Sequence, residues 1–253
     1  MASIWSSALN WTSSRVPSAA ERSTLDEALR AASGRGLDAA LELLWTRAAG
    51  LVLVTSTGFA SAFGTLPVDL YPRAEWRCLG FQHDDPTSDV RGAGALAVLV
   101  LARMFDAPGC KVSIGQRYAE KRRRDDEAAA AAHYPLATAA IVCTRSVLAL
   151  LGVCVPVTGR ELPYASTAKP HWHLVATETD LLDLSILLVR LVDDEFDHQK
   201  CTYMTFNSAL KAAEARFALL LADHARDCAD VGALAGRVEW KTSQVECWAR
   251  ESS

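Results

Sequence analysis

The sequence lacks the short motifs that mark most nucleotide-binding and hydrolytic enzymes. It contains no G-x-S-x-G nucleophile motif, no Walker phosphate-binding loop and no G-x-G-x-x-G dinucleotide motif. No two cysteines are spaced as C-x-x-C, and the neighbouring His171 and His173 have no third ligand at a suitable spacing. We therefore expect no metal ion and no cofactor, and we do not expect the chain to bind nucleotide by itself.

The chain also lacks a strong net charge and an uninterrupted hydrophobic run. A formal net charge of −4 gives no broad electrostatic attraction to nucleic acid, so we expect no nucleic-acid partner. The longest apolar stretch, Leu136 to Val157, contains Arg145 with Thr144 and Ser146 beside it. Because an ionised arginine is costly in mid-bilayer, we predict a buried helix here and no transmembrane segment.

The cysteines do not indicate a disulfide framework. They are odd in number and scattered, and no secretory hydrophobic segment precedes them. These features predict reduced thiols in a cytoplasmic protein. The seven cysteines are Cys78, Cys110, Cys143, Cys154, Cys201, Cys228 and Cys247.

Hydrophobic periodicity predicts an all-α fold. Near the N-terminus, Thr24 to Glu27 is typical of a capping box, and Gly34 and Gly36 are expected to end the helix that follows. The pattern from Leu51 to Gly64 fits a helix or a strand. Apolar residues at helical spacing predict a second helix, at Leu37, Leu41, Leu44, Trp45 and Ala48.

Further helices are expected along the rest of the chain. Opposite charges from Lys121 to Glu127 favour a solvated helix. Pro135 is suited to the first turn of a helix that runs through Leu151, and Thr177 to Asp180 are expected to cap a helix from Leu181 to Val192. The last helix begins at Tyr203 to Asn207 and carries apolar residues at Phe206, Leu210, Ala213, Phe217 and Leu220. The acidic residues Asp193, Asp194, Glu195 and Asp197, with His198, are expected to form an exposed turn at a helix end.

The most informative segment runs from Trp76 to Phe105, the signature segment. In its first half, Asp85 precedes Pro86 and is therefore biased toward an extended or turn conformation. Asp85, Ser88 and Asp89 carry side-chain oxygens that accept hydrogen bonds from nearby backbone N–H groups, so a turn leading into a helix is predicted.

The second half of the signature segment places an arginine between glycines. Gly92 and Gly94 flank Arg91 and allow backbone angles that present an arginine to a partner. The apolar run from Ala95 to Phe105 then predicts a buried helix, with Leu99 and Leu101 in or near the core. Arg91 could instead pair with Asp89 or Asp85 and hold the turn together.

The signature segment resembles that of the ELMO-domain family: W-x-x-x-G-F-Q, a short acidic gap, P-x-x-D-x-R-G-x-G-x-L and an apolar helix. It departs from that pattern at Ser88, where threonine is usual, and at Val90, where an aromatic residue is usual. The tracts beginning at His133 and Tyr203 resemble two further blocks of the family, so the resemblance covers Leu37 to Leu221. The matching positions are Trp76, Gly80, Phe81, Gln82, Pro86, Asp89, Arg91, Gly92, Gly94 and Leu96.

The resemblance implies a single multi-helix ELMO domain over residues 23–221, with less-ordered tails at 1–22 and 222–253. We expect Trp76, Phe81 and Leu96 to be core residues, and we expect a structural role for Gln82. The candidate residues that bind the partner or support the site are Trp76, Gly80, Phe81, Gln82, Pro86, Asp89, Gly92 and Gly94.

The resemblance also implies regulation of a small GTPase. Short, single-domain members of the family look like GTPase-activating proteins for Arf and Arf-like GTPases and carry an arginine at the position of Arg91. Long members are scaffolds beside DOCK-type exchange factors for Rac and lack that arginine. The short class fits this chain better, with Arg91 as the catalytic residue, a GTP-bound Arf-type GTPase as partner, a role in membrane traffic, and membrane association only through the partner. The alternative is a non-catalytic ELMO-type scaffold or binding module.

Overall fold

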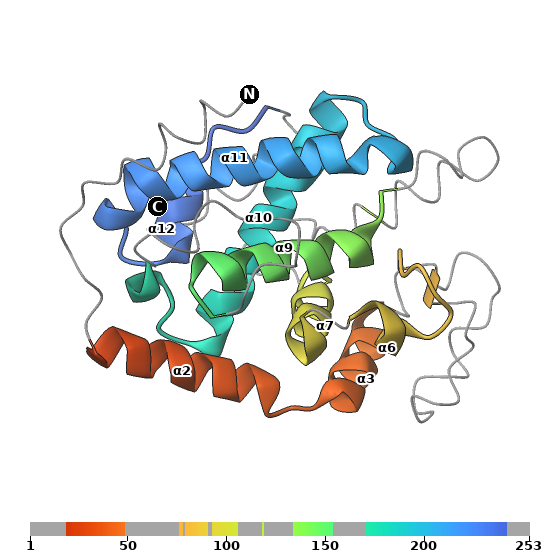
Figure 1. The fold of residues 1–253 in the computed structure, drawn as a ribbon, viewed down its shortest axis with the longest axis horizontal. Coiled ribbons are helices and arrows are strands. Elements are labelled where there is room, and N and C mark those ends of the chain that lie inside the picture. The colour runs from red at the N-terminus through yellow and green to blue at the C-terminus, as the bar shows by residue number, and fades with distance from the viewer. Residues whose placement is uncertain are drawn as a thin grey trace.

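The computed structural model describes residues 19–48, 76–77, 79–90, 93–105, 118, 134–153 and 171–241 (Figure 1). All regular elements within these ranges are helices, as the sequence predicted. The predictions for Leu51 to Gly64 and for Lys121 to Glu127 lie outside the described residues. The α-helices are α2 (Ala19–Ser33), α3 (Leu37–Ala48), α6 (Pro86–Asp89), α7 (Gly94–Arg103), α9 (Leu136–Leu150), α10 (Glu178–His198), α11 (Phe206–His224) and α12 (Val231–Ala235), and the 3-10 turns are η3 (Trp172–Leu174), η4 (Tyr203–Thr205) and η5 (Ala225–Asp227).

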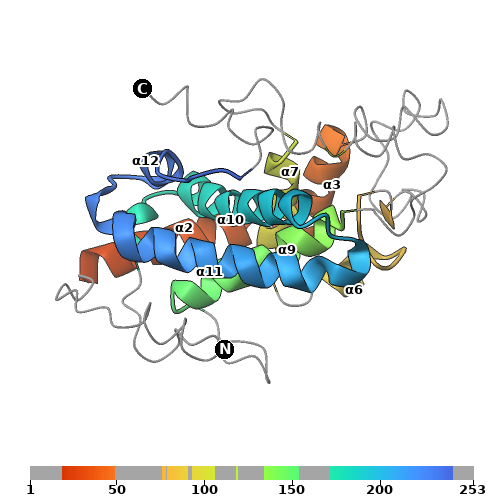
Figure 2. The same ribbon diagram turned by 90° about the horizontal axis from the view of Figure 1, so that it is seen from above.

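Helix α10 is the centre of the packing. It contacts α2, α7, α9, α11 and α12, and Figure 2 shows it running through the bundle between α11 and the helices of the N-terminal half. Thr177 and Asp180 cap its N-terminus, as predicted, although the helix is longer at both ends than the predicted Leu181 to Val192. The Thr177 hydroxyl accepts from the Asp180 N–H and the Asp180 carboxylate accepts from the Thr177 N–H, which is a capping box. These two bonds satisfy backbone donors that the first turn of a helix leaves without intrahelical partners.

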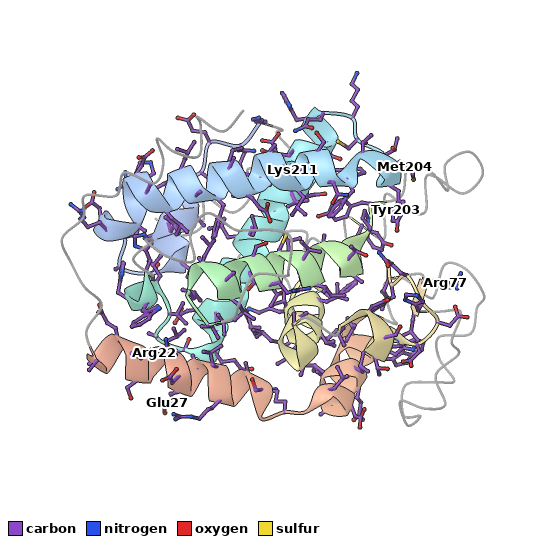
Figure 3. All side chains as sticks on the ribbon, in the orientation of Figure 1. Arg22, Glu27, Arg77, Tyr203, Met204 and Lys211 are labelled. Carbon is purple, nitrogen blue, oxygen red and sulfur yellow. The ribbon has the colours of Figure 1, made fainter. Side chains whose placement is uncertain are left out.

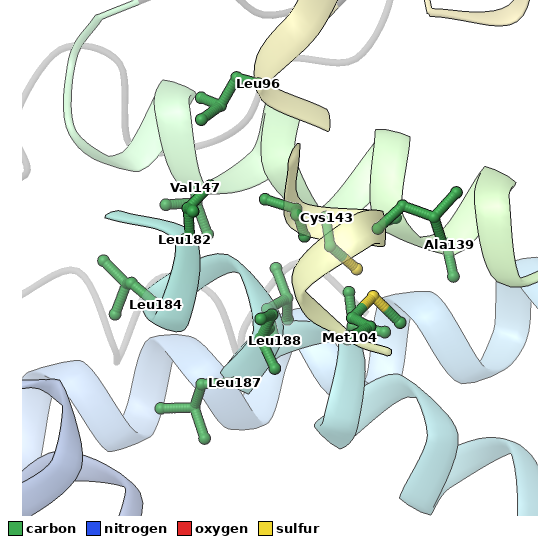
Figure 4. Close-up of a cluster of buried hydrophobic side chains, with 14 of the residues drawn as sticks. Leu96, Met104, Ala139, Cys143, Val147, Leu182, Leu184, Leu187 and Leu188 are labelled. Carbon is green, nitrogen blue, oxygen red and sulfur yellow. The ribbon is translucent and has the colours of Figure 1, made fainter. Parts of the chain in front are cut away.

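Helix α7 is buried along almost its whole length, as its apolar sequence predicted. Leu99 is 3% exposed and Leu101 is 1% exposed, and the helix packs between α3 and α9. Figure 4 shows Met104 near side chains of α9 and α10. Arg103 leaves this core toward α10, where its guanidinium donates to both carboxylate oxygens of Asp183 at 2.6 and 2.9 Å. This bidentate pair fixes the C-terminal end of α7 on α10.

The first two helices confirm one prediction and correct another. Gly36 has φ +73 between α2 and α3, so the predicted glycine break is present. The predicted capping box at Thr24 is wrong, because α2 already begins at Ala19. The Thr24 hydroxyl lies inside the helix and donates to the carbonyl of Ala20 at 3.0 Å. A hydroxyl one turn into a helix bonds backward to a carbonyl, so the local pattern did not mark the helix start.

The prediction of an exposed acidic turn was wrong for Asp193, Asp194 and Glu195, which are buried in the last turns of α10. Asp197 is half-buried, and His198 is exposed as predicted. Asp194 is 0% exposed and Glu195 is 1% exposed. The Arg216 guanidinium donates to both carboxylates at 2.8 Å, and the Lys241 ammonium lies 2.8 Å from Glu195. Asp193 is also buried, at 4% exposed. Cationic partners from distant segments make the burial of these charges tolerable.

The chain beyond residue 221 contributes to the same core. Helix α12 is capped by the Asp230 carboxylate, which accepts from the Ala233 N–H at 2.7 Å. Leu234 of this helix is 0% exposed, and Trp240 packs against the core as a partly buried residue. The backbone N–H of Lys241 donates to Asp194. Among the described residues, no helix is both long enough and apolar enough to cross a bilayer.

Candidate functional site: the loop before helix α7

The aromatic residues of the signature segment anchor it in the core. Trp76 is 2% exposed and lies between the rings of Trp45 and Phe81, at centroid distances of 5.3 and 5.7 Å. Phe81 meets Trp76 edge to face, an arrangement that aromatic quadrupoles favour. Phe81 and Leu96 are each 5% exposed, so the expectation that these residues belong to the core is confirmed. These side chains support the site from the core and expose little surface to a partner.

Gly80 permits close contact between the signature segment and the start of α9. It has φ +86, and a Cβ atom at this position would lie 2.7 Å from the backbone nitrogen of Leu136. The carbonyl of the preceding residue, Leu79, accepts from the Ala137 N–H at 3.1 Å. Pro135, the cap residue of α9, makes no side-chain capping bond. The Leu79 carbonyl therefore serves as a capping acceptor for α9. The two backbones can approach this closely only because residue 80 is a glycine.

Asp85 and Pro86 start the short helix α6, as the sequence predicted. The Asp85 carboxylate accepts from the Thr87 N–H at 2.9 Å and from the Thr87 hydroxyl at 2.7 Å. Pro86 occupies the first turn and is buried. The Ser88 hydroxyl donates to the Asp85 carbonyl at 2.8 Å, so it acts as a donor and not as the predicted acceptor.

We call residues 79–90, which include α6, the signature loop. Asp89 joins the two ends of this loop. Its carboxylate accepts from the backbone N–H groups of Gln82 at 2.7 Å and of His83 at 3.2 Å, and it pairs with the His83 ring Nδ1. The Asp89 side chain is 7% exposed, whereas the His83 side chain is 62% exposed. A buried carboxylate with several donors holds a loop firmly, because its charge would otherwise be buried without hydrogen-bond partners.

The residues on either side of Arg91 and Gly92 are fixed. Val90 is 2% exposed, and its carbonyl accepts from the Ala93 N–H at 3.0 Å and from the Gly94 N–H at 2.7 Å. Gly94 has φ +56, in agreement with the predicted need for glycine at this position. Arg91 and Gly92 themselves lie outside the described residues, so their predicted roles stay predictions. The valine that departs from the family pattern is a buried anchor.

Sequence reasoning missed His83 and the reason for Gly80. His83 was not singled out, although a histidine six residues before an aspartate is within reach once a turn is expected between them. Gln82 was expected to be structural, and its backbone N–H does bind Asp89, while the residue as a whole is exposed. Gly80 faces a helix more than fifty residues away in sequence, and no local pattern reports that contact.

The other candidate cluster, His171 and His173, forms packing contacts. Their rings meet edge to face at 5.8 Å, and the His173 ring lies 2.8 Å from the carbonyl of Ala225. Burial, together with the neighbouring His173 and Arg226, lowers the pKa of His171 to about 4. No group of three or more potential metal ligands lies among the described residues. The described cysteines Cys143, Cys201 and Cys228 are free thiols, as expected.

Among the comparisons with known proteins, the one with protein families gives a match. The model of the ELMO/CED-12 family matches residues 38–210, which include the signature loop, α7, α9, α10 and the start of α11. Searches of curated proteins and of solved structures found no significant match.

Proposed function

The chain belongs to the ELMO/CED-12 family and has a role in small-GTPase signalling, and we propose that it is a GTPase-activating protein for Arf or Arf-like small GTPases. In this proposal, Arg91 enters the nucleotide site of the GTP-bound partner. In this proposal the protein acts in trans on the partner's reaction and is not itself a hydrolase.

The chemistry requires positive charge opposite the γ-phosphate. Charge moves onto phosphate oxygens as the bond to the leaving group breaks, and an arginine supplied in trans stabilises that charge. Arginine suits this task because it is always protonated and presents a planar set of donors. Such an arginine raises the hydrolysis rate by about 10³- to 10⁵-fold.

The observation that supports the proposal best is the anchoring of the chain on both sides of Arg91. Asp89 is held by Gln82 and His83, and the Val90 carbonyl holds Ala93 and Gly94. Behind them, α7 is locked in the core and paired with α10 through Arg103. A catalytic group delivered to another protein gains from such a rigid base, because less conformational freedom is lost when the complex forms.

A panel of GTP-loaded Arf-family GTPases, with and without the protein, tests the proposal. We expect single-turnover GTP hydrolysis to accelerate for at least one of them, and a Rac-type GTPase serves as the comparison. Binding without acceleration would instead support the non-catalytic scaffold. Gly92, Gly94, Pro86 and the aromatic residues are proposed to support the site without touching the nucleotide. Cytoplasmic location, and membrane association through the partner alone, belong to the same proposal.

A further inference from the structure

Two exposed apolar side chains lie at the same end of the molecule as the signature loop. Tyr203 is 44% exposed and Met204 is 82% exposed, both in the turn η4. Figure 3 shows them on the side where Arg77, at the start of the signature segment, also lies. Single exposed apolar residues are common on soluble proteins. Two consecutive ones matter here because of their position, and among the described residues the only other large exposed hydrophobic side chain is Leu219, at 46%.

The turn that carries them is rigid. The Thr205 hydroxyl accepts from the Thr202 N–H at 2.8 Å, and the Thr205 N–H donates to the Thr202 carbonyl at 3.0 Å. The next residue, Phe206, is 6% exposed and holds the turn against the core. Tyr203 and Met204 are thus presented by a pre-organised backbone, which lowers the entropy lost when a partner binds.

The turn η4 and the signature loop rest on the same end of α9. The Tyr134 ring, two residues before α9, lies 6.2 Å from the Phe206 ring. Gly80 of the signature loop lies against the backbone of Leu136, the first residue of α9. Figures 1 and 2 show α6 and the start of α11 at this same end of the bundle in two perpendicular views.

We propose that Tyr203 and Met204 form an apolar contact for the small GTPase that receives Arg91. This inference rests on the proposed function and adds the surface on which the GTPase docks. A protein whose nucleotide site reaches the signature loop must cover the surface around that loop. The partner surface that meets η4 is expected to be apolar, and the flexible methionine side chain is suited to filling an irregular apolar pocket.

The test measures affinity separately from chemistry. Met204→Ser is compared with Leu219→Ser, a matched control because Leu219 lies on α11 about 20 Å along the helix axis from Phe206. Binding of each variant to the GTP-loaded GTPase is measured in an Arg91→Ala background by titration calorimetry. We expect Met204→Ser to weaken binding about 10-fold or more, Leu219→Ser to leave it unchanged, and Met204→Leu to retain it. With Arg91 present, Met204→Ser should raise the KM for the GTPase and leave kcat unchanged.

The outcomes separate the two proposals. If the wild-type protein binds and Met204→Ser binds equally well, the docking contact is refuted and the proposed function stands. If the wild-type protein binds no GTPase of the panel, the proposed function fails and the docking contact fails with it. Loss of binding in Met204→Leu as well as Met204→Ser would contradict an apolar contact of this kind. If light scattering shows self-association that Met204→Ser abolishes, the surface belongs to a second copy of the chain and the inference is overturned.

Discussion

The buried carboxylate of Asp89 accepts a 2.7 Å hydrogen bond from the backbone N–H of Gln82, seven residues earlier in the chain. The same carboxylate binds the backbone N–H and the ring of His83. One side chain therefore closes the loop that leads to Arg91. Its loss should lower both the stability of the protein and its stimulation of GTP hydrolysis.

Replacing Asp89 with alanine should lower the free energy of unfolding by about 1 to 3 kcal/mol, because two backbone donors lose their acceptor. Arg91→Ala should lower the free energy of unfolding by less than Asp89→Ala does. Chemical denaturation of the two variants makes the comparison. A larger loss of stability for Arg91→Ala would assign the structural role to the arginine.

Gly80→Ala should destabilise the protein by about 2 to 4 kcal/mol, since it combines a positive φ with a Cβ that would lie 2.7 Å from the Leu136 nitrogen. Gly94→Ala is the matched control. Gly94 also has a positive φ, but a Cβ there meets nothing within 4 Å. It should therefore cost only the backbone strain, about 1 to 2 kcal/mol. Equal losses in thermal and chemical melts would argue against the close contact with α9.

Leu99→Ala should cost about 2 to 5 kcal/mol, because it opens a cavity in the centre of α7. Leu219→Ala, at an exposed position of α11, should change the free energy of unfolding by about 0.5 kcal/mol or less. Urea unfolding curves measure both variants. A cost near zero for Leu99→Ala would mean that α7 is not packed as described.

Stability should fall as the pH drops from about 6.5 to about 4, in part because of His171. Its pKa is lowered to about 4 in the folded protein, from an ordinary histidine value of 6.5. The unfolded chain therefore binds a proton in this range that the folded chain does not, and the equilibrium shifts toward unfolding as the pH decreases. The effect amounts to at most about 3 kcal/mol.

The unfolding free energy of the wild-type protein and of His171→Phe, measured from pH 7 to pH 4, checks this account. The variant should show a shallower decline over that range. Parallel curves would show that His171 does not contribute. Glu195 changes the stability at lower pH. Burial raises its pKa, but hydrogen bonds from Lys241, Gln199 and Arg216 outweigh this effect and lower the pKa below its ordinary value of 4.5. Its contribution is therefore complete above about pH 4.5 and is lost as the pH falls further.

The sequence predicted features whose causes are local. The Thr177–Asp180 capping box, the glycine break at Gly36 and the burial of Leu99 follow from residues within a few positions of one another. Asp194 and Glu195 looked like a solvated turn because their cationic partners, Arg216 and Lys241, lie far along the chain. The contact that explains Gly80 also comes from a distant helix. Long-range pairing decides burial, and a single sequence does not display it.

The candidate site also contains features that the sequence predicted and features that only the structure shows. Asp85 was predicted, with Ser88 and Asp89, to accept hydrogen bonds in a turn leading into a helix, and it is the N-cap of α6. Asp89 was recognised only as an acceptor, and its closing of the loop onto Gln82 and His83 appears only in three dimensions. The proposed role of Arg91 rests on the family and on the anchored residues around it.

The central claim is that Arg91 accelerates GTP hydrolysis on an Arf-type partner, and single-turnover hydrolysis with Arg91→Lys tests it most directly. Lysine keeps the charge but loses the planar set of donors, so we expect stimulation to fall by about 10³-fold or more while binding of the GTP-loaded GTPase and the melting temperature stay unchanged. Arg91→Ala should behave in the same way. Stimulation equal to that of the wild-type protein in both variants would contradict the account.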